Sequence, residues 1–487
     1  MDSPRRRFDH ALRRYGTWWG FGLWQAAWAL FYRTHGLRVY GLDVPMWHRL
    51  PDAWLQGREV WASLWVLHMQ PPLWNAFYAA LLRLPSAWRE PLVWLLFQLM
   101  AWHIQVMGYK LLRAQHVPRI GAAVGMAAWL LYPEFVAVLH TFKYTLPVMW
   151  LLMLLVWTWQ FRPRALAWPL TGLALLRATY GWPFLALVLG WARLRRRWPG
   201  WRAVLIPLSL LGLWSLKNGV LFGLWGTTSS WFGMNWLRNV RLLYWGDPKA
   251  TREILAQGVD PIIQYPTFAA IETYPRAYWA EVAQNCQGPP ALCSPRRPDA
   301  VTHNFNHIGY IPVSRAMARA AAQIWWHNPG VMLRIEQDMA LDLLLSPAFY
   351  ILYPADALTP LWGSWVAARD AWLCSGQRFD VHHYLRPPWG RALCPGFQRI
   401  YLGVLGLAFG LMLVPWSRPR RGGWPELALL VVLYAGTVYT LVDFLENARM
   451  RLEVDVLWWL LALWAGFRSL ALVHEGWRRA RQRLAGR

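Results

Sequence analysis

The stretch FKYTLPVMWLLMLLVWTWQF, residues 142–161, decides the class of fold, because it is long and apolar enough to cross a lipid bilayer as one helix. Nine other segments have the same character, and most approach the ~20 residues that a spanning helix needs. They cover residues 17–35, 71–85, 91–109, 120–138, 165–190, 201–222, 397–416, 424–445 and 454–474. The sequence therefore predicts an all-α polytopic membrane protein with about ten to twelve transmembrane helices.

Basic side chains gather in short clusters beside these spans, at residues 5–14, 193–197, 418–421 and 478–487. Such clusters are typical of the cytoplasmic loops of membrane proteins. We therefore attribute the formal net charge of +25 to these loops and not to a nucleic-acid-binding surface. We therefore expect a multi-pass membrane location with both termini in the cytoplasm. The first span is too long for a cleaved signal peptide and is expected to be a retained anchor.

Three regions follow from this layout. Residues 1–222 form an amino-terminal bundle with a first external loop at 36–70, residues 223–396 form an extracytoplasmic segment, and residues 397–487 form the last helices and a basic tail. All four cysteines lie in the extracytoplasmic segment, which predicts disulfides there. The near neighbours Cys286–Cys293 and Cys374–Cys394 are the favoured pairs, although three connectivities are possible. Residues 331–354 are amphipathic enough for a helix at the membrane interface.

The orientation of the spans between 71 and 190 has two solutions. The basic segment KLLRAQHVPR, residues 110–119, is expected in the cytoplasm, yet a simple count of crossings places it outside. Either the short 71–85 helix does not cross fully, or 165–190 is a hairpin that turns near Arg177.

The stretch HMQPPLWN, residues 68–75, places polar side chains where the second apolar helix begins. Proline is well tolerated in the first turn of a helix, so the two prolines fix where this helix starts. His68, Gln70 and Asn75 either cap and hydrate the interface or contact a substrate. The preceding loop carries the carboxylates Asp43 and Asp52.

An acidic residue after the first span, followed within some thirty residues by a polar residue and PPL, resembles the GT-C superfamily of integral-membrane glycosyltransferases, particularly bacterial members. That superfamily includes the protein O-mannosyltransferases and the aminoarabinose transferase of lipid A. The stretches KNGVLFGLWGTTSSWFGMNWLRN (217–239), HNFNHIGYI (303–311) and ENARMRLEVDVL (446–457) are also similar to this group. The sequence LHTFKYTLPV, residues 139–148, departs from it, because relatives carry an acidic residue before Tyr-Thr whereas Glu134 is the nearest carboxylate here.

The resemblance implies a GT-C-like fold in a bacterial inner membrane and a catalytic base at Asp43, with Asp52 as the reserve candidate. It also implies transfer of a sugar from a polyprenyl-phosphate donor to a hydroxyl of a lipid, glycan or protein acceptor on the outer face. No cofactor is expected, although a divalent metal is left open.

Basic and amide side chains at the external ends of the spans suit such a donor. Arg and Lys match phosphate oxygens, and neutral amides or imidazole match sugar hydroxyls. The candidates for phosphate are Lys217, Arg238, Arg449 and Arg451, with Arg177 beside them, and those for the sugar are Asn235, Asn304, Asn306 and His307. The alternatives are arginines that only snorkel to the interface and a polar loop that satisfies its own backbone.

Three other function classes are weighed against this one. A transporter or flippase is disfavoured because no internal repeat or charged mid-span residue is evident. A polysaccharide ligase or polymerase with a lipid-diphosphate donor shares the large external loop and the basic residues. A structural scaffold with a degenerate site is the third alternative. Soluble-enzyme signatures such as a Walker loop, GxGxxG, HExxH or GxSxG are absent from the sequence.

Overall fold

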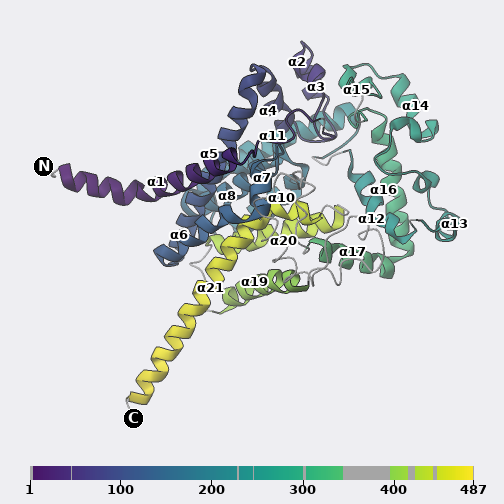
Figure 1. Ribbon diagram of the computed structural model, residues 1–487. Coiled ribbons are helices and arrows are strands. Elements are labelled where there is room, and N and C mark those ends of the chain that lie inside the picture. Colours follow the sequence, from purple (N-terminus) through teal and green to yellow (C-terminus); the bar gives the residue numbers. More distant parts are fainter. Residues whose placement is uncertain are drawn as a thin grey trace.

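The computed structural model describes residues 4–44, 46–226, 230–244, 246–299, 303–343, 395–414, 423–442 and 447–485. Regular structure in this part of the chain is helical (Figure 1). Extended backbone pairs there only at two isolated bridges, Tyr40 with Thr141 and Arg296 with His303. The predicted all-α class is confirmed for the described residues.

The amino-terminal region forms a helical bundle, into which the last three helices pack. Its helices are α1 (Pro4–Thr34), α4 (Leu73–Leu82), α5 (Ser86–Ala114), α6 (Arg119–Ala128), α7 (Pro133–Leu139), α8 (Thr145–Phe161), α9 (Ala167–Leu176), α10 (Trp182–Leu194) and α11 (Trp201–Phe222). The carboxyl-terminal helices are α19 (Pro395–Leu413), α20 (Trp424–Val442) and α21 (Asn447–Ala485), of which α20 and α21 contact α8. The predicted first external loop contains two short helices, α2 (Asp52–Gln56) and α3 (Val60–Trp65).

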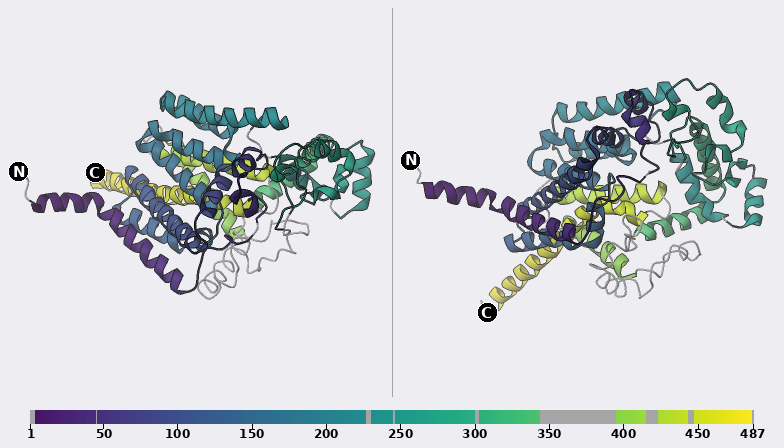
Figure 2. Two further views of the ribbon diagram at one scale, coloured as in Figure 1. Left: turned by 90° about the horizontal axis from the view of Figure 1, so that it is seen from above. Right: turned by 45° about the horizontal axis from the view of Figure 1, so that its top comes forward.

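Side-chain contacts define two ends of this bundle. At the first, which we call the loop end, Arg33 at the close of α1 forms an ion pair of 2.6 Å with Glu90 near the start of α5. At the opposite end, the Trp424 indole donates to the Leu111 carbonyl (2.8 Å), and its backbone N–H donates to Gln160 (3.0 Å). The chain termini project away from the side of the molecule that holds α13, α14 and α16 (Figures 1 and 2).

Four of the helices are long and apolar enough to cross a membrane, and a fifth is obtained if a bent pair counts as one span. The four are Ser86–Ala114, Trp201–Phe222, Trp424–Leu441 and Arg451–Arg483, and the pair joins Arg119–Leu131 to Pro133–Leu139 at an angle of 66°. A polytopic membrane protein is thus supported, but the predicted number of ten to twelve exceeds this count. The other predicted spans correspond to helices that are shorter or less apolar, including α4, α8 and the α19 segment Gln398–Leu413.

Both solutions to the orientation problem are realised in the structure. Helix α4 has ten residues, about 15 Å, and the chain on either side of it lies at the loop end, because the Val39 N–H donates to Glu90 (3.2 Å). Residues 165–190 are broken at Arg177, which has extended backbone angles and lies 5.1 Å from the Tyr144 ring at the start of α8. Arg197, beyond the end of α10, donates to the Trp159 carbonyl near the other end of α8 (3.4 Å). The segment therefore runs as a hairpin. Residues 110–119 lie opposite the loop end, because Leu111 binds Trp424 there.

The segment that the sequence analysis predicts to be extracytoplasmic forms a second group of helices beside the loop end (Figure 2). They are α12 (Phe232–Val240), α13 (Pro248–Ala256), α14 (Arg276–Gln284), α15 (Pro290–Cys293), α16 (Tyr310–His327) and α17 (Pro329–Leu343). Helices α12 and α16 approach so closely that a Cβ atom at Gly233 would lie 1.8 Å from the Ser314 carbonyl oxygen. Helix α17 covers the first part of the predicted interfacial helix 331–354, and the remainder lies outside the described residues.

Candidate active site at the loop end of the bundle

The first external loop is fastened where it leaves α1. The Tyr40 N–H donates to the His140 carbonyl (2.8 Å), and the Phe142 N–H donates back to the Tyr40 carbonyl (2.7 Å). His140 is fully buried, and burial lowers the pKa of its imidazole to about 4, so the ring is neutral at pH 7. The loop therefore starts against the segment 139–148 that the sequence analysis singled out.

A compact turn follows this bridge; its described residues are 41–44 and 46–49. Gly41 has a positive φ of 92°, which a side chain would strain, and Met46 packs against the space where its Cβ would lie. The buried Arg49 guanidinium donates to the Gly41 carbonyl (3.0 Å) and the Val44 carbonyl (2.8 Å). It also lies 4.1 Å from the centre of the Tyr78 ring on α4. Arg49 thus closes the turn and seats it on the bundle.

Arg297, from the predicted extracytoplasmic segment, binds the backbone of the same turn. Its guanidinium donates to the carbonyls of Met46 (3.1 Å) and Arg49 (2.7 Å), and it forms an ion pair of 2.6 Å with Asp299. The Arg297 side chain is almost completely buried. Burial lowers the pKa of Arg49, the nearby Arg297 lowers it further, and the Tyr78, Asp52 and Asp43 side chains oppose this effect. Sequence reasoning missed Arg49 and Arg297 as parts of the site.

The two candidate carboxylates have different surroundings. Asp43 is exposed on the turn, and its carboxylate accepts no hydrogen bond from the described part of the chain. Asp52 opens α2 and accepts a hydrogen bond from the Tyr78 hydroxyl (2.7 Å). A carboxylate that is held in place and open to solvent can accept a proton from an incoming hydroxyl. Asp43 fits this role better than Asp52, which already has a partner.

The backbone of residues 65–69, which we call the latch segment, is held by side chains from three distant elements. Lys217 on α11 donates to the carbonyls of Trp65 (3.0 Å) and Leu67 (2.7 Å). The Asn306 amide oxygen accepts from the N–H groups of His68 (3.0 Å) and Met69 (3.4 Å), while its nitrogen donates to the Val66 carbonyl (3.3 Å).

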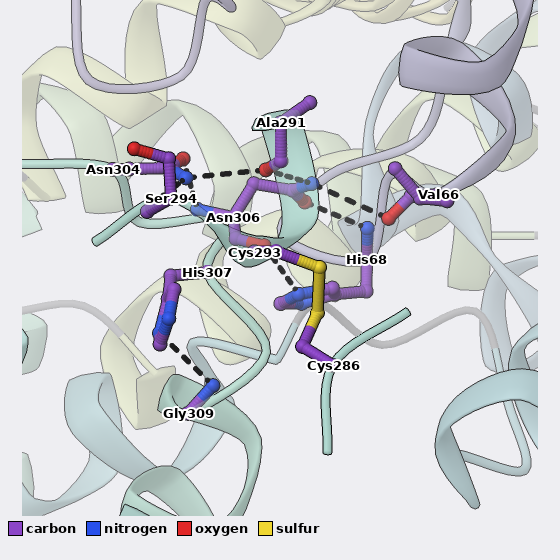
Figure 3. The surroundings of a disulfide bond; sticks show 10 residues. All are labelled: Val66, His68, Cys286, Ala291, Cys293, Ser294, Asn304, Asn306, His307 and Gly309. Atoms are coloured by element: carbon purple, nitrogen blue, oxygen red, sulfur yellow. Dashed lines mark hydrogen bonds between the residues drawn. A yellow bond between two sulfur atoms is a disulfide. The ribbon is translucent and has the colours of Figure 1, made fainter. Parts of the chain in front are cut away.

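The His68 ring is also used inside the protein. It contacts the Asn306 carbonyl (2.8 Å; Figure 3) and the Ser230 hydroxyl (2.8 Å). Burial lowers the pKa of the His68 imidazole to about 3. The Ser230 N–H donates to the His68 carbonyl (3.0 Å). His68, ahead of the two prolines, therefore helps to position the backbone that leads into α4.

A disulfide supports the Asn306 side of the latch. Cys286 and Cys293 are bonded, which confirms this predicted pair, whereas Cys374 and Cys394 lie outside the described residues. Between the paired cysteines, the Ala291 carbonyl accepts from the side chains of Asn304 and Asn306, both at 3.2 Å (Figure 3).

The next residues of the HNFNHIGYI motif bind α15, the short helix that ends at Cys293. His307 hydrogen-bonds the backbone of Cys293, and the Ile308 N–H donates to the Leu292 carbonyl (3.0 Å). The motif is thereby attached to α15.

The remaining predicted site residues take different positions. Asn75 is fully buried, accepts from the Leu50 N–H (2.8 Å) and donates to the His48 carbonyl (3.2 Å), so it fastens the end of the turn. Gln70 is half-buried before α4, and Asn235 and Arg238 are half-buried on α12. Arg449 lies in the first turn of α21, and its side chain is outside the described residues.

Arg451 belongs to a second polar cluster at the loop end. It is fully buried, pairs with Asp455 one turn later (3.0 Å) and lies 5.2 Å from the Tyr401 ring. Glu453, on another face of α21, forms an ion pair with Arg177 and accepts a hydrogen bond of 2.5 Å from the Tyr439 hydroxyl. These charges join the hairpin at Arg177 to α20 and α21. The buried ion pair of Arg451 with Asp455 gives this arginine a structural role beside the phosphate-binding role predicted for it.

No described group of three or more His, Cys, Asp and Glu side chains could hold a metal ion. The described residues of the first loop offer a carboxylate, Asp43, on a clamped turn, and the buried Arg49 guanidinium interacts electrostatically with it. No family model matches the sequence, and neither a curated protein nor a solved structure is significantly similar to it.

Proposed function

We propose that the protein is a membrane glycosyltransferase of the GT-C type, which moves a sugar from a polyprenyl-phosphate donor to an acceptor hydroxyl on the extracytoplasmic face. The observation that carries the proposal is the turn 41–49, which is clamped by Arg49 and Arg297 and presents Asp43 to solvent. A loop fixed on both sides loses little freedom when it reacts, and a fixed catalytic group gains rate through orientation.

In the proposed reaction Asp43 accepts the proton of the acceptor hydroxyl. The acceptor oxygen then forms a bond to the anomeric carbon, and the bond between that carbon and the phosphate oxygen breaks. The electron pair of that bond leaves with the polyprenyl phosphate. Arg449 is the predicted partner of this phosphate, because α21 begins at the loop end, where Glu453 pairs with Arg177.

Asp52 has a positioning role in this scheme. Its hydrogen bond to Tyr78 ties α2 to α4, and the Tyr78 ring is also the surface on which Arg49 lies. Loss of Asp52 is therefore expected to disturb the turn without removing the base.

The donor class is tested with the purified protein in lipid nanodiscs. We expect it to consume a polyprenyl-phosphate sugar and to ignore the matching nucleotide sugar, because the proposed site lies at the end of a membrane bundle where a lipid-linked phosphate arrives. Arg449→Ala should weaken donor binding by about 1.5–3 kcal/mol, the typical contribution of a charge-assisted hydrogen bond. Consumption of the nucleotide sugar alone would refute the donor class, and turnover of a lipid diphosphate sugar alone would favour a ligase or polymerase.

A further inference from the structure

Trp47 is an exposed aromatic side chain on the same turn as Asp43. It is 52% exposed although its ring contacts two others: it is stacked near Phe268 at 6.3 Å with 27° between the planes, and it lies 5.7 Å from Phe305. An apolar ring that water still reaches, on a loop that is otherwise clamped, marks a candidate binding surface.

The backbone around Trp47 is rigidly held. Arg297 donates to the carbonyls of Met46 and Arg49, one residue before Trp47 and two after it, and the Arg49 N–H donates to the Met46 carbonyl (3.0 Å). The indole is therefore presented at a fixed place and does not swing freely with a surface loop.

Phe268, whose ring lies next to Trp47, has an unusual backbone conformation. Phe268 has a φ of +58°, in the left-handed region that costs a non-glycine residue of order 1–3 kcal/mol. Its neighbours fix it there, because the Tyr274 hydroxyl accepts from the Ala269 N–H (3.1 Å) and the Tyr310 hydroxyl donates to the Ala269 carbonyl (2.7 Å). Strain of this kind persists where the surrounding structure requires the side chain in one position.

Buried and half-buried rings support this pair from behind. Phe305 is 2% exposed, and the half-buried Trp231 packs edge-on against both Phe268 (5.7 Å) and Phe305 (5.6 Å). The result is a rigid aromatic surface, formed by Trp47 and Phe268, between the first external loop and the extracytoplasmic segment.

Polar residues lie near Trp47 and near the rings that support it. Asp43 is four residues from Trp47 on the closed turn, so their Cα atoms are at most ~15 Å apart, and the exposed His303 lies 5.9 Å from the Phe305 ring. A flat aromatic ring beside a few hydrogen-bonding groups suits a ligand with one apolar face and a polar rim. A pyranose ring has this shape, since its axial C–H groups form an apolar face and its hydroxyls lie around the edge.

We propose that Trp47 and Phe268 form a sugar-binding platform, on which a pyranose ring stacks against the indole of Trp47. That this ring belongs to the substrate of Asp43 rests on the proposed function, whereas the capacity of the platform to bind a sugar does not. The donor sugar and a glycan acceptor offer the same stacking face, so the experiment has separate arms for the two.

The direct test is saturation-transfer NMR on the protein in deuterated-lipid nanodiscs, with a panel of methyl α- and β-pyranosides as probes. We expect transfer to the ring C–H protons of at least one glycoside, at least a fivefold weaker affinity in Trp47→Ala, and affinity within threefold of wild type in Trp47→Phe. Trp61→Ala is the matched control, because Trp61 lies in the same loop and is 78% exposed. It should bind like the wild type.

Three results would overturn the platform: no transfer from the wild-type protein to any glycoside, unchanged binding in Trp47→Ala, or an equal loss in Trp61→Ala. The last would assign exposed indoles of this loop to the lipid interface. In the second arm, polyprenyl-phosphate mannose competes with the bound glycoside. Competition that Trp47→Ala removes assigns the ring to the donor, and its absence assigns the ring to an acceptor. Glycoside binding in a protein that transfers no sugar would refute the proposed function and leave the platform intact.

Discussion

Asn306→Ala removes the side chain that makes most contacts with the latch segment. The fully buried Asn306 amide makes four hydrogen bonds: it accepts from the His68 and Met69 N–H groups and donates to the Val66 and Ala291 carbonyls. The Ala291 carbonyl keeps Asn304 as a donor in the variant, whereas the other three groups lose this partner.

The size of the effect follows from these contacts. A buried backbone group left without a partner costs about 1–3 kcal/mol, and the long bond to the Met69 N–H (3.4 Å) contributes least. We therefore expect the variant to lose about 3–5 kcal/mol of stability, concentrated where the first loop meets the predicted extracytoplasmic segment.

The assay is thermal unfolding in detergent together with amide hydrogen exchange. Exchange at His68 and Met69 should accelerate in Asn306→Ala, while the helices opposite the loop end keep their protection. Asn285→Ala is the matched control, because Asn285 is an exposed residue of the same segment. If Asn306→Ala unfolds and exchanges like this control, the latch does not fasten the loop.

Three further predictions concern stability. Replacing Cys286 and Cys293 together by Ser should lower stability by about 2.5 kcal/mol, the chain-entropy value for a loop of this length, as measured by urea unfolding with and without reductant. Gly233→Ala should destabilise by about 2–3 kcal/mol because its methyl group meets the α16 backbone, whereas Gly212→Ala, which meets no atom within 4 Å, should not lower the melting temperature. His68 has a pKa of about 3 in the folded state and ~6.5 in the unfolded state, so the unfolded state binds a proton at higher pH than the folded state does. The free energy of unfolding should therefore fall as the pH drops below 6.5 and stay constant between pH 7 and 8. In His68→Gln the melting temperature should depend less on pH over the acidic range.

The sequence predicted where most helices lie but not how many cross. Hydropathy alone identifies residues 165–190 as one apolar run, and it was the placement of the basic residues that suggested a reversal near Arg177, where the backbone is extended. Hydropathy also predicts the ten-residue α4 as a spanning helix, because a helix packed at one end of a bundle is as apolar as one that crosses the membrane. Cys286–Cys293 was predictable because the two residues are neighbours in sequence.

The polar site was less predictable, for a physical reason. His68 and Asn306 were recognised as unusual polar residues, but they are 238 residues apart, and sequence spacing does not show that one binds the backbone beside the other. Arg49 and Arg297 were missed because a chain with 50 basic residues offers no local signal for the two that donate to carbonyls of one turn.

The central claim, that a clamped loop presents Asp43 as a catalytic base, is tested most directly by the rate of sugar transfer from a polyprenyl-phosphate donor in Asp43→Asn. We predict a loss of about 10²–10⁴-fold, the usual contribution of a general base, with an unchanged melting temperature because the side chain is exposed. Asp52→Asn should lose less, and Glu59→Gln, an exposed substitution in the same loop, should transfer sugar like the wild type. Wild-type transfer by Asp43→Asn, or a larger loss in Asp52→Asn, would contradict the account.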